Sequence, residues 1–189
     1  PISVYGRTKA IVEQMMLDTA NSDPSWRCLV LRYFNPVGAH ESGLLGEATQ
    51  EVPANLAPHI TEVIVGKRGY VNVFGADYPT SDGTGVRDYI HVLDLADGHA
   101  AALTYLQEQD IEYEIFNLGV GRGISVLEMI RSFEVVSGSP IEYKILPRRS
   151  GDVAECFADA SKARALLGWK ATRTIEEMCR SAVAFASQS

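Results

Sequence analysis

CLVLRYF, at residues 28–34, is the stretch that decides the fold of this 189-residue chain. Its first four residues are apolar, which is typical of a strand buried on both faces of a parallel sheet. Upstream, apolar residues repeat at helical spacing between residues 5 and 20, and Pro24 prevents that helix from continuing. A helix followed by such a strand predicts the end of a βαβ unit.

Strands and helices alternate through the rest of the chain, which predicts the α/β class with some mixed pairing beyond the first strand. Further strands are expected at residues 70–74, 86–92, 113–118 and 141–146. Helices are expected near Asn55, after an Asp94 cap, and from Ser125, Ser161 and Thr174. Ser125 and Thr174 each precede a glutamate by three residues, which is the spacing of a capping box.

Proline and glycine mark the connections between these elements. We expect Asn35-Pro36 to end the first strand, with loops at residues 38–46 and 75–85. The glycine-rich residues 119–123 follow a strand and precede a helix, as a dinucleotide-binding motif would. Their third glycine falls one residue short of the GxGxxG spacing, so this stretch predicts a turn.

Composition excludes several classes of partner. The formal net charge is −7 and no run of basic residues exceeds two, which argues against nucleic acid or an anionic membrane surface. No apolar stretch approaches the roughly 20 residues that span a bilayer, so we expect a cytoplasmic protein. The three cysteines form no CxxC pair and the four histidines have no metal-ligand spacing. Reduced thiols and no metal site are expected.

Tyr5 and Lys9 carry the first sign of chemistry. They lie four residues apart on the predicted helix and therefore share one face. A nearby cation favours a phenolate, which could take a proton from a hydroxyl group while hydride leaves the same carbon. Such a pair also arises by chance as a packing or solvated pair. The block at residues 31–40 favours chemistry, because it follows at the distance of one helix, one turn and one strand.

Several longer motifs accompany this pair, and they are spread over essentially the whole chain. They are LRYFNPVGAH at residues 31–40, NLAP at 55–58, NVFG at 72–75, DGTGVRDYIHV at 82–92, NLGVG at 117–121 and RRSGD at 148–152. With these motifs the sequence resembles the extended short-chain dehydrogenase/reductases, and among them the UDP-glucose 4-epimerases closely.

The resemblance implies the end of a Rossmann-like doubly wound sheet plus a smaller mixed α/β substrate-binding domain. Residues 1–38 would complete the NAD-binding domain with its catalytic helix and one strand. Residues 39–189 would form the UDP-sugar domain, with about 86–106 packing back on the NAD-binding domain. The resemblance also implies a homodimer.

The implied reaction interconverts UDP-glucose and UDP-galactose. In such enzymes, tightly held NAD takes hydride from C4, the 4-keto sugar rotates, and hydride returns to its opposite face. The resemblance makes Tyr5 the catalytic acid/base, Lys9 the residue that tunes it and holds the nicotinamide ribose, and Tyr33 a neighbour of the nicotinamide.

Ten further residues match positions that hold the UDP-sugar in that family. They are Asn35, Asn55, Leu56, Asn72, Val73, Phe74, Arg87, Tyr89, Arg149 and Asp152. The chemistry of these side chains is suitable, because arginine forks bind pyrophosphate and a phenyl ring can cover uracil. Without the motif, a surface salt bridge is the simpler interpretation of each arginine, and each asparagine could cap a turn.

Cys156 stands where some family members carry a bulky tyrosine beside the C2 substituent of the sugar. Its smaller side chain predicts that UDP-N-acetylhexoses are also accepted. The family's glycine-rich phosphate loop has no counterpart in residues 1–189, so we expect these residues alone to be inactive. Two alternatives stay open, a non-catalytic UDP-sugar-binding fragment and a related UDP-sugar dehydratase or decarboxylase.

Overall fold

The computed structural model describes residues 1–48, 53 and 55–188. Helices alternate with strands along the chain, so the predicted α/β class is confirmed. In chain order the elements are α1 (Val4–Ser22), β1 (Cys28–Tyr33), β2 (Asn35–Val37), α2 (Leu56–Ile64), β3 (Val71–Phe74), β4 (Val86–His91), α3 (Val92–Glu108), β5 (Tyr113–Leu118), β6 (Gly123–Ser125), α4 (Val126–Ser137), β7 (Tyr143–Leu146), β8 (Glu155–Cys156), α5 (Ser161–Leu167) and α6 (Ile175–Ala186).

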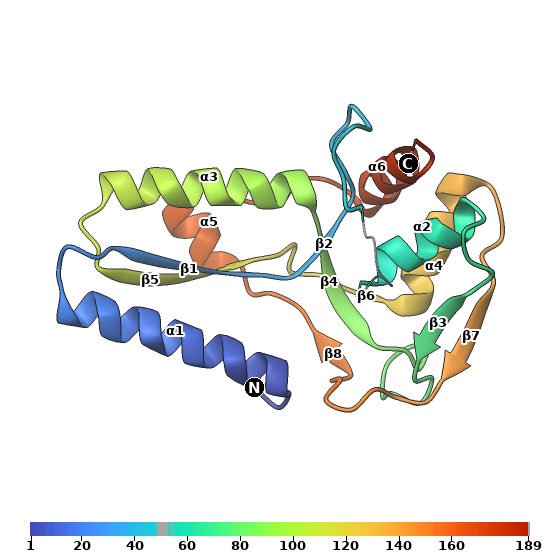
Figure 1. Cartoon of the computed structure of the whole chain (residues 1–189), viewed down its shortest axis with the longest axis horizontal. Coiled ribbons are helices and arrows are strands. Elements are labelled where there is room, and N and C mark those ends of the chain that lie inside the picture. Colours follow the sequence, from blue (N-terminus) through green and yellow to red (C-terminus); the bar gives the residue numbers. More distant parts are fainter. Residues whose placement is uncertain (49–52, 54, 189) are drawn as a thin grey trace.

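The chain forms two lobes side by side (Figure 1). In the first lobe, β1 pairs in parallel with β5, α1 covers one face of the pair, and α3 and α5 cover the other. In the second lobe, α2, α4 and α6 pack together beside the parallel pair formed by β3 and β7. The predicted parallel strand at residues 28–34 is therefore covered on both faces.

Strand β4 joins the two lobes. It pairs in parallel with β2, from Asn35 opposite Tyr89, and with β8, where Arg87 lies opposite Cys156. On its other side it pairs antiparallel with β6. Side chains alternate between the two faces of a strand. Tyr89 accordingly joins the core of the second lobe, whereas Ile90 joins the core around β5.

Three details differ from the sequence predictions. Asn35-Pro36 follows the end of β1 but belongs to the separate strand β2, where a proline is tolerated because β2 lies at a sheet edge. The turn predicted at residues 119–123 ends earlier, since Gly123 begins β6. Asp94 is not the N-cap of α3; the ring of His91 caps this helix by accepting the N–H of Leu93 at 3.0 Å.

The capping boxes predicted at Ser125 and Thr174 are both present. In each, the hydroxyl accepts the backbone N–H of the glutamate three residues later, whose carboxylate returns to the backbone of the cap. Gly138 ends α4 with a φ of 69°, a conformation that glycine adopts without strain. Local sequence signals therefore fix the ends of these helices.

Asp88 is fully buried at the meeting point of three segments. Its carboxylate accepts backbone N–H groups from Val120 at 3.0 Å, Gly121 at 2.8 Å and Ala158 at 3.1 Å. A Cβ atom at Gly119 would lie 2.7 Å from this carboxylate, so the close approach requires glycine. Asp88 thus fixes the β5–β6 turn and the segment after β8 against β4.

Replacing Asp88 with alanine should lower the free energy of unfolding by about 3–5 kcal/mol, because three backbone N–H groups lose a fully buried acceptor. Urea denaturation followed by circular dichroism measures this change. Asp110→Ala is the matched control, because Asp110 is exposed, and a change within about 0.5 kcal/mol is expected there. A loss below about 1 kcal/mol for Asp88→Ala would contradict the role given to the carboxylate.

Candidate functional site

A cavity of about 160 Å³ lies between β2, β3, β4, α2 and the segment before β8. We call it the β4 cavity. It is lined by Asn35, Pro36, Val37, Asn55, Leu56, Ala57, His59, Asn72, Phe74, Tyr78, Gly85, Arg87, Tyr89, Val126, Arg149 and Asp152. Nine of the residues predicted to hold a UDP-sugar are among them, although they come from five separate parts of the sequence.

The other predicted residues lie elsewhere. Val73 is buried in the core of the second lobe, because its side chain leaves the opposite face of β3 from those of Asn72 and Phe74. Cys156 is exposed on β8, opposite Arg87 in the strand register. Tyr5, Lys9 and Tyr33 belong to α1 and β1 of the first lobe and do not line the cavity.

Two arginines and one aspartate form the charged wall of the β4 cavity. Asp152 lies between them, 2.9 Å from Arg149 Nε and 3.8 Å from Arg87 Nη2. The guanidinium of Arg149 also stacks over the ring of Phe74, with 4.9 Å between its carbon and the ring centroid. Two positive charges against one negative charge leave this wall net positive in an acidic chain. The wall can receive an anion next to a half-buried aromatic ring.

Neutral polar side chains complete the lining. Burial raises the pKa of Tyr89, so its hydroxyl stays protonated and can donate a hydrogen bond. Asn35 donates to the carbonyl of Asp88 at 2.8 Å, which fixes its amide. Asn55 occupies the N-cap position of α2, but its side chain makes no capping bond and contacts Glu47 at 3.4 Å. The Asn55 amide is therefore oriented by its contact with Glu47 in the loop after β2.

Sequence reasoning missed two residues with polar groups at this cavity. His59 lies four residues after Asn55 and therefore on the same face of α2, a spacing that could have identified it. Burial and the nearby charge of Arg68 lower the pKa of His59, which favours the neutral imidazole. Tyr78 lies in the stretch predicted to be a polar loop. No periodicity marks that stretch.

Tyr5 and Lys9 share one face of α1, as their spacing predicts. The ammonium of Lys9 lies 5.3 Å from the centroid of the Tyr5 ring, and 72% of Tyr5 is exposed. Tyr33, at the carboxyl end of β1, is also exposed. The start of α1 touches the far lobe, because a Cβ atom built on Gly151 would lie only 3.3 Å from that of Ser3. Helix α1, which carries the exposed Tyr5, therefore begins beside the turn that carries Arg149 and Asp152.

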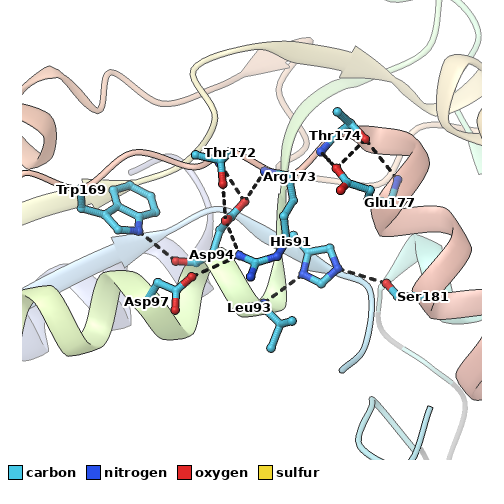
Figure 2. A network of polar contacts seen from close by, with 10 residues as sticks. All are labelled: His91, Leu93, Asp94, Asp97, Trp169, Thr172, Arg173, Thr174, Glu177 and Ser181. Atoms are coloured by element: carbon cyan, nitrogen blue, oxygen red, sulfur yellow. Dashed lines mark hydrogen bonds and ion pairs between the residues drawn. The ribbon is translucent and has the colours of Figure 1, made fainter. Parts of the chain in front are cut away.

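A polar network behind the cavity connects β4 and α3 with α6 (Figure 2). His91 Nε2 lies 3.1 Å from the hydroxyl of Ser181, which also accepts the N–H of Ala39 at 3.1 Å. Because Nδ1 accepts the N–H of Leu93, His91 is neutral and its Nε2 carries the proton. The network thus holds the backbone that follows β2, the strand bearing Asn35.

The second part of this network is ionic. Asp94 is 2% exposed; its carboxylate pairs with Arg173 and accepts the backbone N–H groups of Thr172 and Arg173. Its backbone carbonyl accepts the indole N–H of Trp169 at 3.0 Å (Figure 2). Asp97 adds a second, more exposed carboxylate to Arg173. These contacts fasten the segment between α5 and α6 onto the start of α3.

Comparison with known proteins identifies the family. A family model described as GDP-mannose 4,6 dehydratase matches residues 1–182. The chain belongs to the GDP-mannose 4,6-dehydratase family. Within this family it is similar to the UDP-glucose 4-epimerases of Bifidobacterium longum and Dictyostelium discoideum, at 54% identity to each. These matches cover 95% and 94% of this chain and 52% of each relative, so the chain spans about half the length of the curated relatives it matches.

Solved structures of the family have the same fold. The structure of UDP-glucose 4-epimerase from Bifidobacterium longum in complex with NAD+ and UDP matches with a TM-score of 0.94 and 52% identity, over 97% of this chain and 54% of that one. The enzyme from Stenotrophomonas maltophila, solved with NAD and formylated UDP-arabinopyranose, matches with a TM-score of 0.92 and 50% identity, over 96% and 54%. The predicted resemblance is confirmed.

None of the helices in residues 1–48 and 55–188 is both long and apolar enough to cross a membrane. Within the same residues, histidine, cysteine, aspartate and glutamate side chains do not gather into a group that could hold a metal ion.

Replacing His91 with asparagine should weaken the acid sensitivity of the fold. Burial lowers the pKa of His91 below its ordinary value of 6.5, so below that pH the unfolded chain binds a proton more readily than the folded chain. Stability should therefore decrease as the pH falls below about 6.5. Asparagine can still cap α3 but does not titrate. Urea denaturation midpoints at several pH values measure the effect.

His40→Asn serves as the control, because His40 lies in the loop after β2 and belongs to no helix cap. The wild type and this control should lose stability in parallel as the pH falls, whereas His91→Asn should lose less. An unchanged pH dependence for His91→Asn would show that this histidine does not limit stability in acid.

Proposed function

We propose that this chain is part of an enzyme that interconverts UDP-glucose and UDP-galactose by inverting the hydroxyl at C4 through a transient 4-keto sugar. One observation carries the proposal. A net positive wall with a stacked aromatic ring lies beside the start of a helix that exposes a tyrosine and a lysine on one face. The relatives named UDP-glucose 4-epimerase favour this reaction over dehydration, decarboxylation or simple binding.

The arginine wall would hold the diphosphate of the substrate. Arg87 and Arg149 offer planar forks that match phosphate oxygens, and Asp152 keeps the two guanidinium groups oriented before the ligand arrives. The ring of Phe74 would cover the uracil, and Asp152 would accept a hydrogen bond from a ribose hydroxyl. Asn35, Asn55, Leu56, Asn72 and Tyr89 would contact the rest of the UDP-sugar, whereas the side chain of Val73 faces the core.

NAD is the proposed cofactor, and the exposed residues of the first lobe suit it. Tyr5, Lys9 and Tyr33 are exposed, and Tyr33 lies at the carboxyl end of β1, where ligands bind in open parallel sheets. Lys9 would hold the nicotinamide ribose, and Tyr33 would lie beside the nicotinamide ring. When bound, NAD would accept hydride from C4 of the sugar and return it.

Proton transfer would be the task of Tyr5. Its phenolate takes the proton of the C4 hydroxyl and gives a proton back to the ketone oxygen after the sugar has rotated. The ammonium of Lys9, 5.3 Å from the Tyr5 ring, stabilises the negative charge of the phenolate. Tyr5 is exposed, so its side chain is accessible to a substrate.

We also propose which residues belong to each domain of the enzyme. Residues 1–38 complete the NAD-binding domain, and residues 39–189 form the UDP-sugar domain with 86–106 packing back. Contacts of α3 with β1 support that return. The pairing of β1 with β5 extends the proposal by assigning residues 113–118 to the NAD side as well. The assembled enzyme is proposed to be a cytoplasmic homodimer, and the exposed apolar side chains of Ile11, Val12 and Met15 are available for such contacts.

Tyr5→Phe tests the proposed reaction in the full-length protein that contains this chain. Conversion of UDP-galactose to UDP-glucose should fall by at least about 10²-fold, because phenylalanine cannot transfer the proton. Calorimetric titration should show UDP binding within about twofold of wild type, since the β4 cavity is intact. Tyr143→Phe, on exposed β7, is the control and should keep full activity. Turnover near the wild-type rate in Tyr5→Phe would refute the proposed acid/base.

Cys156→Tyr tests the substrate range. We propose that the small thiol of Cys156 leaves space beside C2 of the sugar, so that UDP-N-acetylhexoses are accepted. A tyrosine should reduce kcat/KM for UDP-N-acetylglucosamine by at least about tenfold and leave that for UDP-glucose within about threefold. Coupled assays on both substrates measure the ratio. If the wild-type enzyme does not turn over UDP-N-acetylglucosamine, the proposed tolerance is wrong.

A further inference from the structure

An ion pair ties helix α1 to strand β1. Arg32 Nε donates to Glu13 Oε1 at 2.9 Å, and Nη2 of the same guanidinium donates to Oε2. One guanidinium therefore engages both carboxylate oxygens, which fixes the direction of the carboxylate as well as compensating its charge. The hydrogen bonds to Arg32 lower the pKa of Glu13, so this carboxylate is ionised at neutral pH.

Glu13 lies on the face of α1 that carries the proposed catalytic residues. Tyr5, Lys9 and Glu13 follow one another at intervals of four residues, so Lys9 has a phenol one turn before it and a carboxylate one turn after it. A lysine and a glutamate at this spacing can form an ion pair. Among the described residues, however, Glu13 pairs with Arg32, and the Lys9 ammonium lies 5.3 Å from the centroid of the Tyr5 ring.

Alternation of side chains along β1 brings Arg32 to this helix. Leu29 and Leu31 pack into the core that includes residues of α3 and α5, so Arg32 leaves the opposite face of the strand, which α1 covers (Figure 1). On the neighbouring strand β5, the hydroxyl of Tyr113 donates to the backbone carbonyl of Glu13 at 3.3 Å. Two adjacent strands therefore hold the turn of α1 that carries Glu13.

We propose that Arg32 is a positioning residue for proton transfer, because by neutralising Glu13 it leaves the ammonium of Lys9 beside the phenol of Tyr5. This inference rests on the proposed function and adds a residue to the same reaction. Without Arg32, the carboxylate of Glu13 would attract the ammonium towards the following turn of the helix. Less positive charge would then remain beside Tyr5, and its phenolate would form less readily.

Other charged groups near the start of α1 have partners of their own. Arg7 donates to the carbonyl of Ile2 at 3.2 Å. Arg149 and Asp152, in the turn beside the start of α1, pair with each other at 2.9 Å. These groups are the same in every variant described below, so differences between the variants report on Glu13 and Arg32.

A purely structural ion pair would give a different pattern of losses. If the pair only fastened α1 to β1, removing either partner would cause the same harm. If Arg32 neutralises Glu13, removing Arg32 is harmful, removing Glu13 is not, and removing both restores activity. The side chain of Arg32 is 51% exposed, so the pair adds little to stability. Each variant should therefore melt within about 2 °C of wild type.

Arg32→Met, Glu13→Gln and the double variant test the inference in the full-length protein. At neutral pH, kcat for conversion of UDP-galactose should fall about three- to tenfold in Arg32→Met and stay within about twofold of wild type in the other two. The loss in Arg32→Met should shrink as the pH rises, because a high pH forms the phenolate without help from the ammonium. KM should change less than about twofold, since the β4 cavity is intact.

A second measurement follows Tyr5 without turnover. Tyrosinate absorbs ultraviolet light that protonated tyrosine does not, and subtracting the titration of the same variant with Tyr5→Phe added leaves the ionisation of Tyr5. Its midpoint should move upwards by about 0.5–1 pH unit in Arg32→Met, which corresponds to the expected loss of kcat. In the double variant with Glu13→Gln the midpoint should return towards the wild-type value.

Lys162→Met is the matched control. Lys162 pairs with Glu114 and so joins α5 to β5 in the same lobe, and its side chain is 45% exposed. Loss of this ion pair should leave kcat and the Tyr5 midpoint unchanged, because it involves no group on α1.

Three results would overturn the inference: an unchanged Tyr5 midpoint in Arg32→Met, equal losses of kcat in Arg32→Met and Glu13→Gln, or no recovery in the double variant. Failure of the proposed function gives a different result. In that case the wild-type protein and Lys162→Met would themselves not convert UDP-galactose, while the ultraviolet titration would still decide whether Arg32 governs the ionisation of Tyr5.

Discussion

The buried carboxylate of Asp88 holds together the parts of this chain that form its site. It gathers three backbone N–H groups from the β5–β6 turn and from the segment after β8, while its own strand runs between the two lobes. Alternation along β4 then sends Arg87 and Tyr89 to the cavity and Ile90 to the core around β5. The position of the arginine wall follows from this one constraint, since β8 and β6 take their register from β4.

Charge is distributed in a way that suits a diphosphate ligand. The chain as a whole carries a formal charge of −7, yet Arg87 and Arg149 face one cavity with Asp152 as their shared partner. Elsewhere several arginines are paired with carboxylates, as Arg173 is with Asp94 and Asp97. A positive pocket in an acidic surface attracts an anion locally without attracting polyanions generally. The composition argued against nucleic acid, and the cavity shows where an anion can still bind.

Polar side chains fix the backbone behind the cavity. The network around His91 and Ser181 fixes the backbone after β2, and so the strand that bears Asn35, from behind the cavity. Tyr78 lines the cavity, and its buried hydroxyl has no hydrogen-bond partner among the described residues. Polar groups that are fully hydrogen-bonded thus hold the shape of the site.

Local patterns in the sequence determined the α/β class, the capping boxes at Ser125 and Thr174, and the shared helix face of Tyr5 and Lys9, because these depend on residues within a few positions of each other. Only the tertiary structure decided that β1 pairs with β5, that His91 caps α3 in place of Asp94, and that Tyr78 reaches the cavity. Strand pairing and burial depend on contacts between distant segments. Such contacts leave no period or motif in the chain, so only the folded molecule shows them.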